Sequence, residues 1–233
     1  MTILGRRISR LLVLATISIS VAAPSARAQS RFYASVAGTD TMSLERFERA
    51  GATITGVWVT YHFGADRHRD ILRHEYTMTL GADDRPVAVH IVLRRPDTEP
   101  IETYDARFTD DSAIVTIAPD TLPPRRIAAR RGYPLLGSTM SMYGLFVGSA
   151  NAGEPGDSVR VVGVPITGPF VARSALVTRV RPNVLRLDPG AAMFFMASPA
   201  VIDSIVTRGG SVQTRQVGLF DIDAVARAAA KGR

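Results

Sequence analysis

Short runs of alternating apolar and polar residues fill the chain from Phe32 to Ile117, and they constrain its fold more than any other feature. Gly, Pro and Asp separate these runs at a spacing of roughly 10–14 residues. This pattern is typical of successive antiparallel strands. We predict strands at 31–36, 41–48, 53–63, 70–80, 86–95, 101–108 and 113–117.

The clearest hairpin joins strand 70–80 to strand 86–95 through a turn at 81–85. One face of its first strand carries Leu72, His74, Tyr76, Met78 and Leu80. The other face is polar, because the side chains of a strand point alternately to its two faces. One apolar and one wet face predict an antiparallel sheet that is covered on one side.

A different periodicity begins at Pro134. One helical stripe is formed by Leu136, Met140, Tyr143 and Val147. Pro134 suits the first turn of a helix and Gly148 suits its end, so we predict a helix over 134–148. The positions beside the stripe are also apolar, and a helix that is apolar on most of its surface is buried.

A second set of strands follows this helix, predicted at 157–166, 170–181, 184–187, 191–197, 200–207 and 211–218. Asp221 can cap a last helix over 222–230. The fold class is therefore α+β and mostly antiparallel β. A sheet of this many strands curls strongly. We expect a half-barrel around one central apolar helix, together with a C-terminal helix.

The first 28 residues predict a secretory signal peptide. Arg6, Arg7 and Arg10 precede an apolar run of 13 residues from Leu11 to Ala23, which is short of the roughly 20 that span a bilayer. We therefore expect cleavage near Ala28, no transmembrane anchor afterwards, and a periplasmic or secreted protein. Residues 29–233 should form a single β-rich domain.

Charge and cysteine content exclude several classes of function. Residues 1–28 hold four arginines and no acid, so their removal lowers the formal net charge from +7 to +3. That charge on a domain of this size does not indicate nucleic-acid binding. The chain has no cysteine, which excludes disulfides and thiolate chemistry. The densest basic segment, 125–131, is expected to be a solvated loop.

Three segments carry a resemblance to a known group of proteins. They are the hairpin from Tyr76 to Val87, the helix segment from Leu135 to Tyr143, and the tail from Phe220 to Val225. Together they resemble uncharacterised secreted proteins of Gemmatimonadota-type bacteria, a group without an established activity. The layout of a curled sheet holding a helix is similar to periplasmic lipoprotein-carrier half-barrels.

Catalytic chemistry has little support in the sequence. One cluster, His68, Asp70, His74 and Glu75, has side chains that could bind zinc or manganese. However, His74 and Glu75 should point to opposite faces of a strand. Ser138 lies outside any nucleophile-elbow motif. We expect no catalytic residue, no metal and no cofactor.

Apolar capacity is the remaining candidate for function. We expect five side chains to face the concave interior or its mouth and to contact a ligand: Met140, Tyr143 and Phe146 on the helix, and Met193 and Phe195 on a later strand. Flexible methionine side chains adapt to irregular apolar ligands. The alternative is a plain core strand between sheet and helix.

Three functions stay open. The first is a non-enzymatic exported protein that binds an apolar or amphipathic small molecule or lipid in the half-barrel. The second is an interaction or structural role with an envelope protein, through sheet edges or segment 125–131. The third is a metal-assisted hydrolase at the histidine cluster.

Overall fold

A computed structural model describes residues 29–63, 69–150, 153–198, 201–207 and 210–231. The predicted signal peptide, 1–28, and His68 lie outside these residues. The first strands are β1 (Gln29–Ala37), β2 (Asp40–Ala50), β3 (Thr53–Phe63), β4 (Arg69–Leu80), β5 (Pro86–Arg94), β6 (Glu102–Phe108), β7 (Ser112–Ala118), β8 (Arg125–Ala128) and β9 (Tyr133–Leu135). Helix α1 (Met140–Gly148) follows.

The second set is β10 (Ser158–Pro165), β11 (Arg173–Arg181), β12 (Val184–Asp188), β13 (Ala192–Ser198), β14 (Val201–Val206) and β15 (Gln213–Gln216), before helix α2 (Ile222–Lys231). All these strands form one 15-stranded sheet with the order β8-β7-β6-β5-β4-β3-β2-β1-β15-β14-β13-β12-β11-β10-β9. Strands β1 and β15 therefore join two meanders, and β8 and β9 are the two edges.

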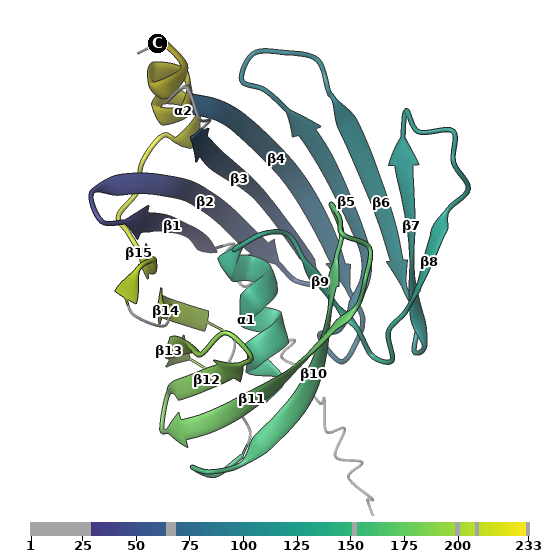
Figure 1. Cartoon of the computed structure of the whole chain (residues 1–233), viewed down its shortest axis with the longest axis vertical. Coiled ribbons are helices and arrows are strands. Elements are labelled where there is room, and N and C mark those ends of the chain that lie inside the picture. The colour runs from purple at the N-terminus through teal and green to yellow at the C-terminus, as the bar shows by residue number, and fades with distance from the viewer. Residues whose placement is uncertain (1–28, 64–68, 151–152, 199–200, 208–209, 232–233) are drawn as a thin grey trace, which may run out of the picture.

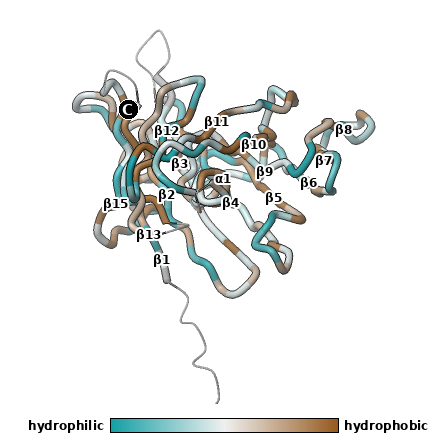
Figure 2. The backbone as a smooth tube through the Cα atoms, turned by 90° about the horizontal axis from the view of Figure 1, so that it is seen from below, coloured by the Kyte–Doolittle hydropathy of each residue, from teal (hydrophilic) through white to brown (hydrophobic). Residues whose placement is uncertain are grey.

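The sheet is curled into an open half-barrel with α1 in its hollow, which confirms the predicted fold class (Figure 1). Hydropathy alternates along many of the strands (Figure 2). In β4, His74, Tyr76 and Met78 are buried while Thr77 and Thr79 are exposed, as the period-two pattern predicts. The meander from β1 to β8 could be predicted from the sequence because each of these strands pairs with its neighbour along the chain.

Helix α1 divides the interior into two apolar clusters. Leu136, Met142 and Leu145 pack with Trp58 and other residues of β3–β8. On the other side of the helix, a second cluster joins the two meanders and includes Tyr33, Met140, Phe146, Val147, Leu185, Phe194 and Ile202. The helix thus supplies the apolar surface that the concave face of a curled sheet needs to bury.

The predicted start of the central helix is wrong. Pro134 lies in β9, which pairs in parallel with β10, and the helix begins only at Met140. Gly137 interrupts the helical pattern because its φ is +50°, in the left-handed region. A Cβ atom at Gly137 would lie 2.0 Å from Cη2 of Trp58. The chain passes so closely over the indole ring that only glycine fits there.

The predicted loop at 125–131 is also wrong in its first half. Residues Arg125–Ala128 form strand β8, which pairs with β7. Ile127 anchors β8, since it is 6% exposed and lies in the first apolar cluster. The arginines around Ile127 favoured the prediction of a loop. The inward side chain of Ile127 nevertheless holds this short edge strand against the core.

Helix α2 lies on the outside of the sheet over β2–β4 (Figure 1). Asp221 accepts hydrogen bonds from the backbone N–H groups of Asp223 and Ala224, both at 3.0 Å, which confirms the predicted cap. Ile222 and Ala226 are buried against Val59 and Ile71. Within the residues described, neither helix has the length and apolar character needed to cross a bilayer.

Replacing Gly137 by Ala should destabilise the protein by about 3 kcal/mol more than the same change at Gly38. Both glycines have positive φ, but a Cβ atom at Gly38 would meet nothing within 4 Å. Gly38→Ala therefore isolates the backbone cost. Urea unfolding of both variants measures the difference. Equal losses would show that Trp58 does not restrict this turn.

Candidate functional site

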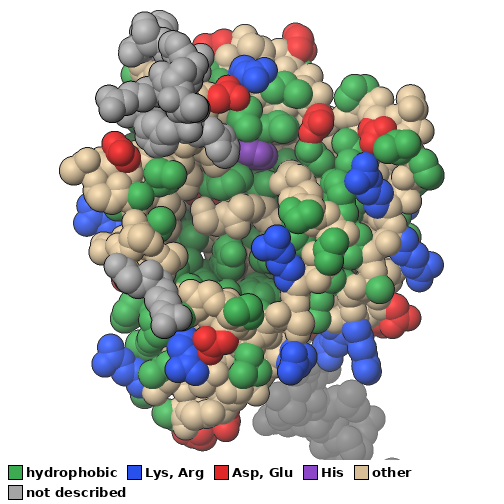
Figure 3. All heavy atoms as spheres, in the orientation of Figure 1, with side chains coloured by type: hydrophobic (Ala, Val, Ile, Leu, Met, Phe, Trp, Pro, Cys, Tyr) green, Lys and Arg blue, Asp and Glu red, His purple; other side chains and the backbone are tan. Residues whose placement is uncertain are grey.

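The predicted ligand residues on α1 lie inside the second apolar cluster. Met140 and Phe146 are each 2% exposed. Tyr143 is half-buried, and its ring centroid is 5.7 Å from that of Phe194. These side chains fill the space between helix and sheet. Figure 3 shows hydrophobic side chains gathered in the middle of this view, with most arginines toward the rim.

Met193 and Phe195 do not face α1, which corrects the predicted interior wall. In β13 the buried residues are Phe194 and Met196, and both belong to the cluster around the helix. Because side chains alternate along a strand, Met193 and Phe195 lie on the opposite face. The apolar run at 193–196 hides this alternation, so its inward register could not be read from composition.

The polar anchor of α1 is the buried carboxylate of Glu45 on β2. Its Oε2 accepts a hydrogen bond from the backbone N–H of Met140, and its Oε1 accepts one from that of Ser141 at 3.3 Å. The Tyr76 hydroxyl donates to Oε1 at 2.6 Å and lies 2.7 Å from the Ser141 hydroxyl. Thr139, the residue before the helix, makes no side-chain cap. Glu45 caps the helix in its place.

Burial governs the protonation of this network. Glu45 is 3% exposed, and desolvation raises its pKa, although the hydrogen bonds from Tyr76, Met140 and Ser141 act in the opposite direction. The pKa of Tyr76 is raised as well, chiefly by burial and then by the neighbouring charge of Glu45. Sequence analysis missed Glu45, although it occupies an inward position of β2 between Ser43 and Phe47.

A cavity of about 450 Å³ lies on the concave face beyond α1, between β6–β8 and the segment that follows β10. Its lining residues are Ile101, Glu102, Tyr104, Ile117, Pro119, Asp120, Arg125, Thr167 and Phe170. We call it the seam cavity, since it separates the two sides of the open half-barrel.

One cation and one aromatic ring bridge the seam cavity. The guanidinium carbon of Arg125 lies 4.5 Å from the ring centroid of Phe170, a cation–π distance. Arg125 is also 3.7 Å from a carboxylate oxygen of Asp120. The Tyr104 hydroxyl donates to Glu102, and burial together with this carboxylate raises the pKa of Tyr104. The cavity thus has an apolar floor and a charged border.

The candidate metal cluster is not assembled among the described residues. His74 is buried and its ring lies tilted against that of Trp58, with ring centroids 4.9 Å apart. Glu75 lies on the other face of β4 and pairs with Arg73, while Asp70 pairs with Arg95 at 3.1 Å. No group of three or more potential metal-ligating side chains occurs within the part of the chain that the structure describes.

Comparison with known proteins identifies a similar fold. A solved structure of a β-barrel-like protein of Domain of Unknown Function DUF1849 from Brucella abortus aligns with a TM-score of 0.54. The alignment covers 83% of this chain and 98% of that protein, at 12% sequence identity. At this identity, the likeness shows the fold alone.

No protein-family model matches the chain, and neither does any curated protein. The resemblance to Gemmatimonadota-type secreted proteins stays a prediction, as does the functional side of the likeness to lipoprotein carriers.

Replacing Glu45 by Ala should lower the free energy of unfolding by about 2–4 kcal/mol. The substitution leaves two backbone N–H groups of α1 buried without their acceptor and removes one of the two partners of the Tyr76 hydroxyl. Glu48→Ala, three residues along the same strand and on the outer face, should cost less than about 0.5 kcal/mol. Equal losses of unfolding free energy in the two variants, measured by chemical denaturation, would contradict the capping role of Glu45.

Glu45→Gln tests the raised pKa. A group whose folded pKa is raised contributes stability below its unfolded pKa, near 4.5, and loses it as pH rises through the folded value. The free energy of unfolding of the native protein minus that of Glu45→Gln should therefore fall as pH rises above 4.5. Unfolding curves at several pH values measure it, and a rising difference would contradict the burial argument.

Proposed function

We propose that the chain is an exported, non-enzymatic protein that binds an amphipathic ligand in the seam cavity of its half-barrel. The observation that carries this proposal is a cavity of about 450 Å³ on the concave face that α1 leaves unfilled. Its volume is within the range of small-molecule sites. Ligand pockets combine an apolar lining with a few polar groups that fix orientation.

The residues around the seam cavity suit a ligand with an apolar and a polar part. Tyr104, Ile117 and Phe170 belong to the first apolar cluster or pack against it, so they offer apolar surface at the inner end. Arg125, Glu102 and Asp120 supply charge at the border. Ile101 lines the cavity, Leu122 is two residues from the lining residue Asp120, and Val171 follows the lining residue Phe170. All three aliphatic side chains are exposed.

This site replaces the one expected between α1 and the sheet. Met140 and Phe146 are fully engaged with other side chains of the core. No residue of α1 lines the seam cavity. A ligand at the seam needs no displacement of the helix.

The sheet edges give less support to a partner protein. Strands β8 and β9 have four and three residues, and β9 contains Pro134. Very short edge strands and proline are devices that prevent pairing with other chains.

Titration with the neutral fluorescent probe N-phenyl-1-naphthylamine tests the seam site. We expect saturable binding to the native protein. Ile101→Glu should weaken this binding at least about tenfold, because it places a carboxylate in the apolar lining. Leu176→Glu is the matched control, since Leu176 is 37% exposed on β11, as Ile101 is 38% exposed, but lies outside the cavity.

The two variants separate the outcomes. Loss of binding in Ile101→Glu alone, with unchanged unfolding curves, supports the seam site. Equal binding in both variants and the native protein places the probe elsewhere and overturns the assignment. Absence of saturable binding to the native protein also overturns it.

A further inference from the structure

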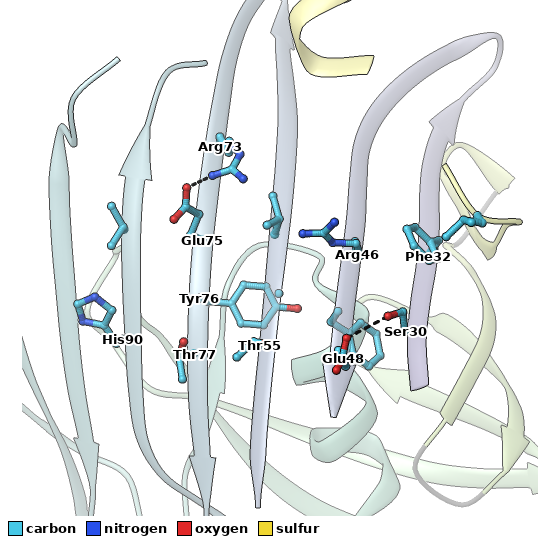
Figure 4. A pocket seen from close by; sticks show the side chains of 15 residues that line it. Ser30, Phe32, Arg46, Glu48, Thr55, Arg73, Glu75, Tyr76, Thr77 and His90 are labelled. Atoms are coloured by element: carbon cyan, nitrogen blue, oxygen red, sulfur yellow. Dashed lines mark hydrogen bonds and ion pairs between the residues drawn. The ribbon is translucent and has the colours of Figure 1, made fainter. Parts of the chain in front are cut away.

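A second cavity, larger than the seam cavity, lies on the opposite, convex face of the sheet. It has a volume of about 740 Å³ and extends across β1–β5 (Figure 4). The pairing register aligns two rows of outward side chains across these strands. One row is Phe32, Arg46, Val57, Glu75 and Val92, and the next is Ser30, Glu48, Thr55, Thr77 and His90.

The hollow arises from the residues of the central strand. Val57 and Thr55 on β3 are short, while the flanking positions on β2 and β4 carry longer side chains such as Arg46 and Glu75. Strands are about 4.8 Å apart, so the two flanking rows are separated by roughly 10 Å. We call this cavity the convex groove, with β3 as its floor.

Two of the charged side chains around the convex groove, Arg73 and Glu75, already have oppositely charged partners. Glu75 pairs with Arg73 and lies 3.3 Å from Arg94, while Arg73 also pairs with Asp223 at 3.1 Å. His90 lies 2.8 Å from Asp105. Through these ion pairs, Arg73 and Glu75 of β4 are linked to α2 and to β5 at one end of the groove. Their charges are therefore already paired.

Arg46 and Glu48 are different, since neither forms an ion pair with another described residue. Glu48 accepts a hydrogen bond from the Ser30 hydroxyl at 3.1 Å. The charge of Arg46 acts on Asp221, but the carboxylate of Asp221 is held by the N–H groups of α2. Figure 4 shows the Arg46 side chain reaching from β2 toward β3.

We propose that the convex groove binds a zwitterion whose cation and anion are about 5–7 Å apart. Residues two apart on a strand are separated by about 7 Å, so Arg46 and Glu48 offer one charge of each sign at this spacing. Arg46 binds the anionic end, and Glu48 the cationic end. In the same row, Thr55 of β3 lies opposite Glu48 and Thr77 of β4 lies opposite Thr55, and their hydroxyls can accept or donate further hydrogen bonds.

Charge complementarity also excludes the simpler ligands. A lone anion at Arg46 would be repelled by Glu48, and a lone cation at Glu48 would be repelled by Arg46. The groove is ample for a dipeptide or for a phosphoethanolamine headgroup, and in both the two charges are close to this spacing.

Amide NMR titration of the native protein with glycylglycine and with O-phosphoethanolamine tests the proposal. Saturable shifts of residues on β2–β4 are expected with one or both ligands. Binding of glycylglycine alone assigns peptides, and binding of phosphoethanolamine alone assigns headgroups. Acetate and methylammonium, each with a single charge, should bind at least about tenfold more weakly.

Arg46→Met and Glu48→Gln should each weaken zwitterion binding at least about tenfold. Arg107→Met and Glu99→Gln are matched controls, because both side chains are exposed and lie outside the groove. Binding that survives Arg46→Met and Glu48→Gln would overturn the proposal. Equal binding of acetate, or no saturable shift up to about 50 mM ligand, would also overturn it. None of these results bears on the seam cavity.

Discussion

The buried carboxylate of Glu45 fixes the central helix against the sheet, and the packing of the interior depends on that contact. Its two carboxylate oxygens accept hydrogen bonds from the N-terminal N–H groups of α1. The hydroxyls of Tyr76 and Ser141 complete the network. The helix has only nine residues and no side-chain cap of its own, so isolated helix formation would be unfavourable. Packing in the hollow and this polar anchor together hold it. Both apolar clusters in turn need the helix, since each includes its side chains.

Local pattern predicted most of the meander, because alternation and turn residues determine strands that pair with their sequence neighbours. The predicted strand at 53–63 agrees with β3 at both ends. Contacts between residues far apart in the chain could not be predicted from local sequence patterns. The left-handed Gly137 over Trp58, the edge strand held by Ile127, and the cap that β2 gives to a helix 95 residues away are all decided by tertiary packing. The inward register of β13 was missed because both of its faces are apolar there.

The two faces of the sheet carry different chemistry. On the concave face, apolar side chains pack against α1. At the seam cavity, which lies beyond the helix, the guanidinium of Arg125 lies over the ring of Phe170. On the outside, the longer side chains of β2 and β4 flank the shorter Thr55 and Val57 of β3, and an ion pair joins Arg73 to Asp223 of α2. One curved sheet thus presents an apolar recess with a charged border and a polar groove. Because strand side chains alternate, the same strands build both.

The junction of β1 with β15 determines how the protein must assemble. The hydroxyls of Ser35 and Thr214 meet at 2.7 Å although 179 residues separate them. Each meander can form from contacts between sequence neighbours, but the middle of the sheet closes only after the last strand is available. Such non-local pairing slows folding, and the unpaired backbone of β1 stays open to other strands in the meantime. Assembly therefore ends at the centre of the sheet rather than at its margins.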